Sequence, residues 1–338
     1  MGDAAREIRR IAAELFDGKK IDVLIGFEKG SDGYRSRPVF VSSAAEAERL
    51  AWDATCSHNL AVYLPSLFRR GPQKKGAESA PPRVGVVAKA CDMRSLIALA
   101  KEKQAPRESL FVIGVPCRGM IDARKLEAEV ARAAGGVEVT ALVDGEEAVS
   151  VETADGRALS FAREPLVHDA CLECRFPVPR GADVMVEGHA RPAGNNGDAL
   201  LKEFAKLSET ERWQKFQAEI SRCIRCYACR QACPTCYCTE CFAETNSPAW
   251  IGVTTELSDT MIFHIVRIFH QAGRCSECDA CVRACPMGID LRPFTKKIAA
   301  DVREMFGFTP GFDLETPPPL LTFREDDQQG FITEPHRG

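Results

Sequence analysis

Residues 222–234 read Arg-Cys-Ile-Arg-Cys-Tyr-Ala-Cys-Arg-Gln-Ala-Cys-Pro, and residues 274–286 read Arg-Cys-Ser-Glu-Cys-Asp-Ala-Cys-Val-Arg-Ala-Cys-Pro. The two segments align residue for residue at an offset of 52 positions, and both have the pattern CxxCxxCxxxCP. The leading Arg, two Ala and the closing Pro are shared as well. This repeat predicts two copies of one cysteine-bearing loop in the second half of the chain.

The spacing within each copy is that of bacterial ferredoxins, in which the fourth Cys of each run binds the cluster of the other run. Two-residue gaps allow three thiolates on one tight loop to bind three corners of a cubane. The Pro after the fourth Cys then redirects the chain. We therefore predict two [4Fe-4S] clusters, one bound by Cys223, Cys226, Cys229 and Cys285 and the other by Cys275, Cys278, Cys281 and Cys233. Zinc is the alternative metal, but a zinc site needs only four ligands in all.

The chain contains 16 Cys in 338 residues, and a disulfide scaffold or a set of buried thiols would also account for many cysteines. Disulfide scaffolds are typical of short secreted chains, whereas residues 1–16 form a charged amphipathic pattern without the apolar core of a signal peptide. The most apolar stretch, 261–269, is too short and too polar to span a membrane. We expect a cytoplasmic protein from an anaerobic setting, in which dense cysteines bind metal. The formal net charge of −4 gives no indication of a nucleic-acid partner.

Residues 1–175 are predicted to form an α/β domain with a partly parallel sheet. Apolar strands at 83–89 and 109–115 flank a helix at 93–103, which is the pattern of a βαβ unit. We also expect a helix at 44–53. Two further strands, 137–143 and 148–152, are predicted to pair antiparallel around Asp144-Gly145.

The remainder of the chain is predicted to form a mainly helical, ferredoxin-like dicluster domain. Residues 176–198 are rich in Pro, Gly and Asn and are interpreted as a linker. Helical patterns run over 199–308 and include a helix at 256–272, between the two cysteine motifs. Residues 309–338 contain three consecutive Pro and no periodicity, and we interpret them as an extended tail.

Four cysteines of the first domain point to a third site. Cys91 and Cys117 each follow a predicted parallel strand, so both thiols would emerge at the same carboxyl edge of the sheet, where α/β sheets bind ligands. Cys171 and Cys174 supply a CxxC pair, which completes a set of four ligands for a third [4Fe-4S] cluster. The alternative is that these are buried thiols without a ligand role.

The remaining residues near the motifs leave alternatives open. Cys56, Cys236, Cys238 and Cys241 could bind a fourth cluster or be spare thiols. The six histidines show no ligand spacing and are interpreted as surface or core residues. Four arginines next to the motifs would either stabilise reduced clusters or be solvated: Arg222, Arg225, Arg230 and Arg274.

The segment 223–238 resembles the dicluster segment of two related subunit families. One is the beta subunit of deazaflavin-dependent hydrogenases and formate dehydrogenases, and the other is the beta subunit of sulfhydrogenases and anaerobic sulfite reductases. The segment Gly85-Val-Val-Ala-Lys-Ala-Cys-Asp-Met-Arg-Ser-Leu and the later Val-Pro-Cys117 are similar to these families too, except that Ala90 stands where Pro is common. The resemblance covers most of residues 80–300.

The resemblance implies a subunit of a larger complex, including those built on heterodisulfide-reductase-like modules. A flavin subunit and a catalytic or heterodisulfide-reductase-like subunit would be its partners. We predict a relay of single electrons through bound clusters. Two alternatives remain: a subunit that binds FAD and itself oxidises or reduces a deazaflavin or nicotinamide coenzyme, and a structural scaffold that binds zinc.

Overall fold

The computed structural model describes residues 3–69, 80–194, 198–323 and 325. The first domain is built on a five-stranded sheet of order β2-β1-β3-β4-β8. β1 (Val23–Lys29) pairs antiparallel with β2 (Ser36–Val41) and parallel with β3 (Val84–Ala88). β4 (Leu110–Gly114) and the two-residue β8 (Val184–Met185) continue the parallel part. The predicted partly parallel sheet, with β3 and β4 as neighbours, is therefore confirmed.

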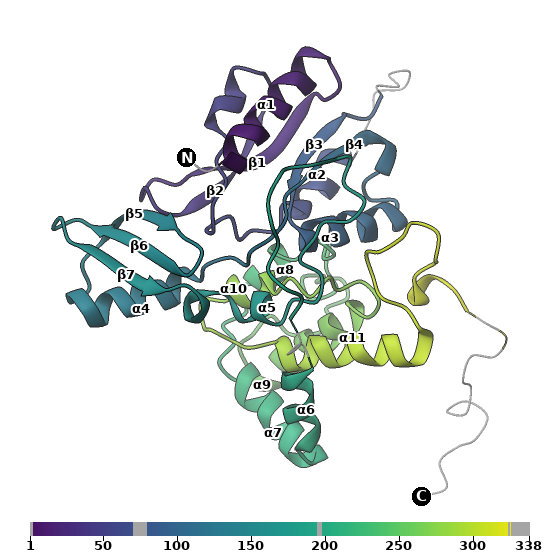
Figure 1. Ribbon diagram of the computed structural model, residues 1–338. Helices are drawn as coiled ribbons and strands as arrows, with labels where there is room; N and C mark the ends of the chain where they lie inside the picture. Colours follow the sequence, from purple (N-terminus) through teal and green to yellow (C-terminus); the bar gives the residue numbers. More distant parts are fainter. Residues whose placement is uncertain (1–2, 70–79, 195–197, 324, 326–338) are drawn as a thin grey trace, which may run out of the picture.

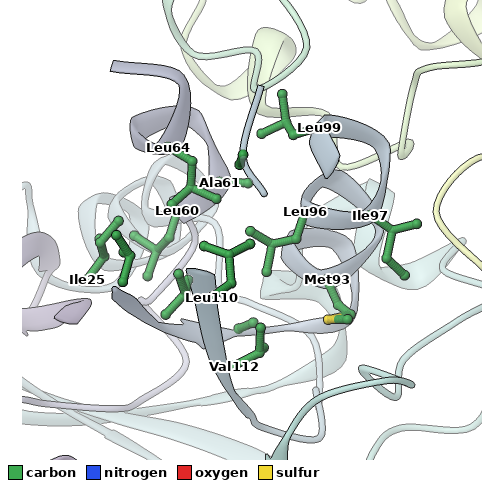
Figure 2. Packing of buried hydrophobic residues seen from close by; sticks show 14 of the residues in the cluster. Ile25, Leu60, Ala61, Leu64, Met93, Leu96, Ile97, Leu99, Leu110 and Val112 are labelled. Atoms are coloured by element: carbon green, nitrogen blue, oxygen red, sulfur yellow. The ribbon is translucent and has the colours of Figure 1, made fainter. Parts of the chain in front are cut away.

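Helices cover both faces of this sheet (Figure 1). α1 (Asp3–Asp17) packs its apolar side against one face, which carries Leu24 and Val87. On the other face, α3 (Ala90–Lys101) and the short α2 (Leu64–Phe68) enclose the larger core, in which Leu64 and Leu96 belong to one cluster of buried side chains with Leu110 and Val112 of β4 (Figure 2). Because both faces are covered, all five residues of β3 are buried, as expected for a central parallel strand.

A second, three-stranded antiparallel sheet follows α4 (Ala123–Ala134). β5 (Val139–Asp144) and β6 (Ala148–Thr153) form the predicted hairpin. β7 (Ala158–Ala162), which was not predicted, pairs with β6 on its other side. The sheet packs on α4 through side chains of both elements and extends the first domain to one side, as Figure 1 shows.

The predicted helix at 44–53 is wrong, because only the 3-10 turn Glu46–Arg49 forms there. The backbone N–H and the hydroxyl of Ser42 both donate to the Glu46 carboxylate, which tightens the start of the turn. The N–H of Ala51 then donates to the carbonyl of Phe27 at 2.7 Å, which draws the chain back along β1. Tertiary hydrogen bonds therefore override the local helical pattern.

The segment 176–198, interpreted as a linker, contributes β8 to the sheet and runs along the loop after β4. The N–H of Cys117 donates to the carbonyl of Pro177 at 3.0 Å, and the N–H of Arg191 donates to the carbonyl of Cys117 at the same distance. Residues 195–197 of this segment, and residues 324 and 326–338 of the predicted tail, lie outside the described residues. Within the described part of the tail, Phe312 packs edge-on against Phe176 at 4.5 Å between ring centroids.

Residues 199–306 carry six helices in the part of the chain that the structure describes: α6 (Ala199–Lys206), α7 (Glu209–Ile220), α8 (Ala228–Gln231), α9 (Leu257–His270), α10 (Ala280–Arg283) and α11 (Arg292–Phe306). The short helices α8 and α10 occupy equivalent places in the two cysteine motifs, at the predicted offset. α9 lies between the motifs, where a helix at 256–272 was predicted. None of the described helices is both long and apolar enough to cross a membrane.

The second cysteine motif lies against the first domain. Arg274 pairs with Glu102 near the end of α3, with 2.7 Å between Nη2 and Oε2. Arg94 of α3 donates to the carbonyl of Ser276 at 2.9 Å, and the hydroxyls of Ser276 and Ser95 are also 2.9 Å apart. This contact places the cysteines of the second motif beside the edge of the main sheet.

Candidate iron–sulfur centres

The four cysteines predicted to bind one cluster line a single small cavity of about 20 Å³: Cys223, Cys226, Cys229 and Cys285. Cys223 and Cys226 come from the loop between α7 and α8, Cys229 is the second residue of α8, and Cys285 follows α10, so the two motifs interleave as the ferredoxin spacing predicts. Cys226 is exposed, and Ile224 beside it is 50% exposed. This first group therefore lies at the surface of the dicluster domain.

The two motif loops share one unusual backbone. Arg225 and Tyr227 have φ values of 54° and 58°, and their counterparts Glu277 and Asp279 have 58° and 51°. Left-handed residues are costly for side chains other than Gly, so their recurrence at equivalent positions indicates a required loop shape. In each loop this shape turns a backbone N–H toward the first Cys: Arg225 donates to Cys223 Sγ and Glu277 to Cys275 Sγ, both at 3.4 Å. Such donors suit thiolate ligands.

The second group consists of Cys275, Cys278 and Cys281 of the second motif together with Cys233 of the first motif. Burial raises the pKa of Cys275, Cys278 and Cys281, and Cys233 is close enough to each of the three to raise it further. Cys233 follows α8 of the first motif, so this set also interleaves the two motifs. Buried thiols of raised pKa keep their protons until a metal displaces them, which is the usual coupling between metal binding and thiol ionisation.

The four cysteines of the first domain line another single cavity, of about 60 Å³: Cys91, Cys117, Cys171 and Cys174. Cys91 is the second residue of α3, directly after β3, and Cys117 follows β4. Cys171 lies in the short helix α5 (Asp169–Leu172), and Cys174 comes just after it. Burial raises the pKa of Cys117 to about 12, and the neighbouring Cys171 adds to the shift. The sheet edge therefore gathers all four thiols in one place.

The surroundings of this cavity fit an anionic group. Arg191 and Arg94 both line it, and three of their buried nitrogens have no hydrogen-bond partner among the described residues: Nε and Nη1 of Arg191 and Nη2 of Arg94. Lys89 also lines the cavity and is 1% exposed, with its Nζ held between Asp92 Oδ2 and the carbonyl of His58, each at 2.8 Å. A cluster with four thiolates is anionic, so the two unpartnered nitrogens of Arg191 suit it, whereas Arg94 Nη2 also lies 3.7 Å from Oε1 of Glu277.

A glycine allows the close packing around Cys117. Gly119 has φ +87°, and its N–H donates to Cys117 Sγ at 3.4 Å. A Cβ at this position would lie 3.0 Å from Val167 and 3.4 Å from the Cβ of Cys171. The turn after Cys117 can therefore approach Cys171 only without a side chain.

The last four cysteines differ in burial: Cys56 is buried, Cys236 and Cys241 are partly buried, and Cys238 is exposed. Cys56 is fully buried in the core under β1 and β3, where the N–H of Asp53 donates to its Sγ at 3.4 Å. Cys236 lies beside Cys233, and the Gln271 amide donates to Cys236 Sγ at 3.4 Å. This placement favours the interpretation of Cys56 as a core thiol and of Cys236 as a thiol shielded beside the second group.

Two side chains of α9 that the sequence did not mark as functional lie at the dicluster sites. His264 is 1% exposed, lines the cavity of the first group, and has its Nε2 3.3 Å from Cys223 Sγ. Burial lowers the pKa of His264 to about 3, so the ring is neutral at ordinary pH. Arg267, one turn further along, is 4% exposed, and its Nη2 donates to the carbonyl of Cys229 at 3.0 Å.

The four arginines noted in the sequence divide by environment. Arg225 and Arg230 are buried, the latter paired with Glu244. Arg274 is largely buried against Glu102, whereas the Arg222 side chain is 44% exposed. The interpretation as a solvated surface residue therefore suits Arg222 but not Arg225, Arg230 or Arg274, which are buried or largely buried.

A larger cavity, of about 660 Å³, lies between the two domains. Its lining includes Arg35, Arg124 and Arg292 together with Tyr34 and Tyr63. It shares Ser57, Ala170 and Arg283 with the lining of the Cys91 cavity, so the two hollows are neighbours. Within the described residues, no group of three or more His, Cys, Asp or Glu side chains is arranged to hold a single metal ion.

Two family models match different parts of the chain. Residues 82–199 match the family model that describes the C terminus of the beta subunit of coenzyme F420 hydrogenase/dehydrogenase. Residues 219–289 match the 4Fe-4S dicluster domain, which confirms the predicted nature of the cysteine repeat.

Two curated relatives match over nearly the whole chain. The F420-dependent formate dehydrogenase subunit beta of Methanocaldococcus jannaschii is 25% identical over 90% of this chain and 91% of the relative. The F420-dependent formate dehydrogenase 1 subunit beta of Methanococcus maripaludis is 24% identical over 94% of both chains. A chain of the F420-reducing [NiFe] hydrogenase complex from Methanosarcina barkeri is 14% identical over 64% of this chain and 86% of that chain, at a TM-score of 0.40, which is too weak a likeness to support an inference. Residues 82–199 of the chain are thus similar to the C-terminal part of the beta subunits of coenzyme F420 hydrogenases and dehydrogenases, and residues 219–289 are similar to the 4Fe-4S dicluster domain.

Proposed function

We propose that this chain is the iron–sulfur electron-transfer subunit of a cytoplasmic multi-subunit oxidoreductase complex. The complex is of the hydrogenase, formate dehydrogenase or heterodisulfide-reductase-like type. In it, the chain relays single electrons between a flavin or coenzyme subunit and a catalytic subunit. The names of the curated relatives, which are subunits of F420-dependent formate dehydrogenases, support this assignment.

One observation carries the proposal: Cys278 of the second dicluster group lines the same cavity as the four cysteines of the first domain. Cys278 also contributes to the raised pKa of Cys91, whose largest cause is burial, so the two thiols are near neighbours. The three cysteine groups therefore form a continuous series, from the edge of the sheet through the second group to the exposed Cys226. Each group would hold one [4Fe-4S] cluster, which supplies one-electron storage.

The chain's own residues prepare this series in three ways. The interleaved motifs fix the positions of two groups relative to each other, and the Arg274–Glu102 pair fixes the second group against the first domain. Burial excludes water from the inner groups. The backbone donors at Arg225, Glu277 and Gly119 stabilise negative charge on the cysteine sulfurs that they contact.

The test is to purify the full chain without oxygen and to measure iron, sulfide, zinc and flavin per chain. Three sites predict about twelve irons, whereas about eight would limit the chain to the dicluster pair and remove the first-domain site. Zinc without iron would overturn the proposal. A matched pair of variants locates the third site: Cys174→Ser should lose about four irons, and Cys238→Ser, at an exposed cysteine outside the three groups, should lose none.

The alternative function, a subunit that binds FAD and itself reacts with a deazaflavin or nicotinamide coenzyme, is favoured by the cavity of about 660 Å³. Its arginines suit phosphate groups, its two tyrosines suit an aromatic ring, and it adjoins the Cys91 cavity. Flavin that is released on denaturation of the purified chain, and lost in an Arg292→Gln variant with unchanged iron content, would establish this alternative. Purified protein that contains no flavin and retains about twelve irons would contradict this alternative and support the electron-relay function.

A further inference from the structure

Two arginines of the dicluster domain, Arg267 in α9 and Arg283 in α10, lie between the cysteine groups without a carboxylate partner. The neighbouring Arg230, Arg274 and Arg94 each form an ion pair, with Glu244, Glu102 and Glu277 respectively. No such pair is found for Arg267 or Arg283 within the described parts of the chain. Asp279 is close enough to influence Arg283 but does not contact it as an ion pair.

Arg267 lies between the two dicluster groups. It is 4% exposed, its Nη2 donates to the carbonyl of Cys229, and its Nε and Nη1 have no acceptor among the described residues. Burial lowers its pKa, but the thiols of Cys281, Cys233 and Cys229 outweigh burial and raise the pKa well above its usual value. Cys229 belongs to the first group, and Cys281 and Cys233 belong to the second, so this guanidinium lies near cysteines of both groups.

Arg283 lies where the second group meets the cysteines of the first domain. Its Nη2 donates to the carbonyl of Ser57 at 2.9 Å, and its Nη1 donates to the carbonyl of Cys278. Arg283 also lines the first-domain cavity together with Cys278, Cys171 and Cys91. Cys278 belongs to the second group, whereas Cys171 and Cys91 belong to the group of the first domain.

A guanidinium enclosed by protein is costly unless a negative charge compensates it. Backbone carbonyls supply only dipoles, and no carboxylate pairs with either arginine in the described residues. A cluster with four thiolates is anionic and becomes more so when it is reduced. Each arginine would therefore be compensated by the clusters on both of its sides, and most strongly when they are reduced.

We propose that Arg267 and Arg283 are the shared counter-cations of the three cluster sites, each raising the reduction potentials of the two sites between which it lies. The second dicluster site, which lies beside both arginines, is then the most strongly stabilised in its reduced form. The inference rests on the proposed function, because it requires bound clusters. It adds that charge between the sites, and not only cysteine ligation, sets the order of their potentials.

The experiment is an EPR-monitored redox titration of the full chain, reduced with dithionite without oxygen, in the wild type and in variants at each arginine. Arg267→Gln should lower the reduced-to-oxidised ratio of both dicluster clusters roughly tenfold at a fixed potential, which is about 59 mV for a one-electron couple. Arg283→Gln should do the same for the second dicluster cluster and for that of the first domain. The lysine variants should recover most of either shift, and Arg222→Gln, at an exposed arginine of the first motif, should change nothing.

Unchanged potentials in both glutamine variants with full iron content would overturn the inference. So would equal shifts in the lysine and glutamine variants, because geometry and not charge would then be responsible. If Arg267→Gln fails to retain iron, Arg267→Lys decides: retained iron supports the charge requirement, and lost iron contradicts it. Absence of iron from the wild type would instead overturn the proposed function, so the two failures are distinguishable.

Discussion

The two cysteine motifs have the same spacing and the same backbone but opposite surroundings. The first motif faces outward, with Cys226 and Ile224 exposed. The second motif faces the first domain: Ser276, which is the counterpart of Ile224, is 6% exposed and contacts Ser95. The cysteine spacing therefore determines how a loop arranges its thiol ligands around a site. Tertiary packing determines whether that site is buried inside the chain or lies at its surface.

Because of this difference, residues at equivalent positions of the two motifs have different structural roles. Arg222 and Arg274 occupy the same position in the two motifs, yet the first is half-exposed and the second holds the domains together. The same substitution made at both equivalent positions therefore separates effects on the cysteine motif itself from effects of the motif's burial against the first domain.

The largest effect is expected at the equivalent ligands Cys278 and Cys226. Cys278→Ser should remove about four irons and destabilise the chain by on the order of 5 kcal/mol, because it leaves buried arginines uncompensated beside an empty interior site. Cys226→Ser should change the iron content of the surface site alone and should destabilise the chain less, because the contact with the first domain stays intact. Iron content and the denaturant midpoint measure both effects. Equal losses of stability in the two variants would contradict the assignment of inner and outer sites.

A smaller effect is expected at the two leading arginines. Arg274→Gln leaves the Glu102 carboxylate, only 8% exposed, without its cationic partner and should cost about 3 kcal/mol. Arg222→Gln removes an exposed pair with Glu219 and should cost about 1 kcal/mol or less. Denaturant unfolding of the iron-loaded chain gives both values, and adding Glu102→Gln to Arg274→Gln should restore part of the loss. If Glu102→Gln restores nothing, the pair does not join the domains.

The cysteine groups could be predicted from the sequence because their geometry is local. Two-residue gaps and a closing Pro specify a loop, and the strands before Cys91 and Cys117 specify a shared sheet edge. The hairpin of β5 and β6 was predictable for the same reason, since alternation and a turn signal lie within a short segment.

Features that depend on tertiary contacts were not predictable. The prediction of a helix at 44–53 was wrong because Phe27, which is distant in the sequence, accepts the hydrogen bond that redirects the chain. His264 and Arg267 lie one turn apart on α9, but no periodicity reveals that this face of α9 meets the cysteine groups. Nor could the burial of Cys56 in the core be separated from a ligand role by counting cysteines.

The smallest effect is expected at the equivalent positions Ser276 and Ile224, where one motif has a polar and the other an apolar side chain. Ser276→Ile forces extra volume into a closed interface and removes the hydroxyl that meets Ser95 Oγ at 2.9 Å, so it should cost about 2 kcal/mol. Ile224→Ser changes a side chain that is 50% exposed and should shift stability by no more than about 0.5 kcal/mol. Denaturant midpoints at equal iron content measure both. A loss on Ile224→Ser as large as that on Ser276→Ile would mean that the first motif is buried within the chain's own fold, and the contrast between an inner and an outer site would fail.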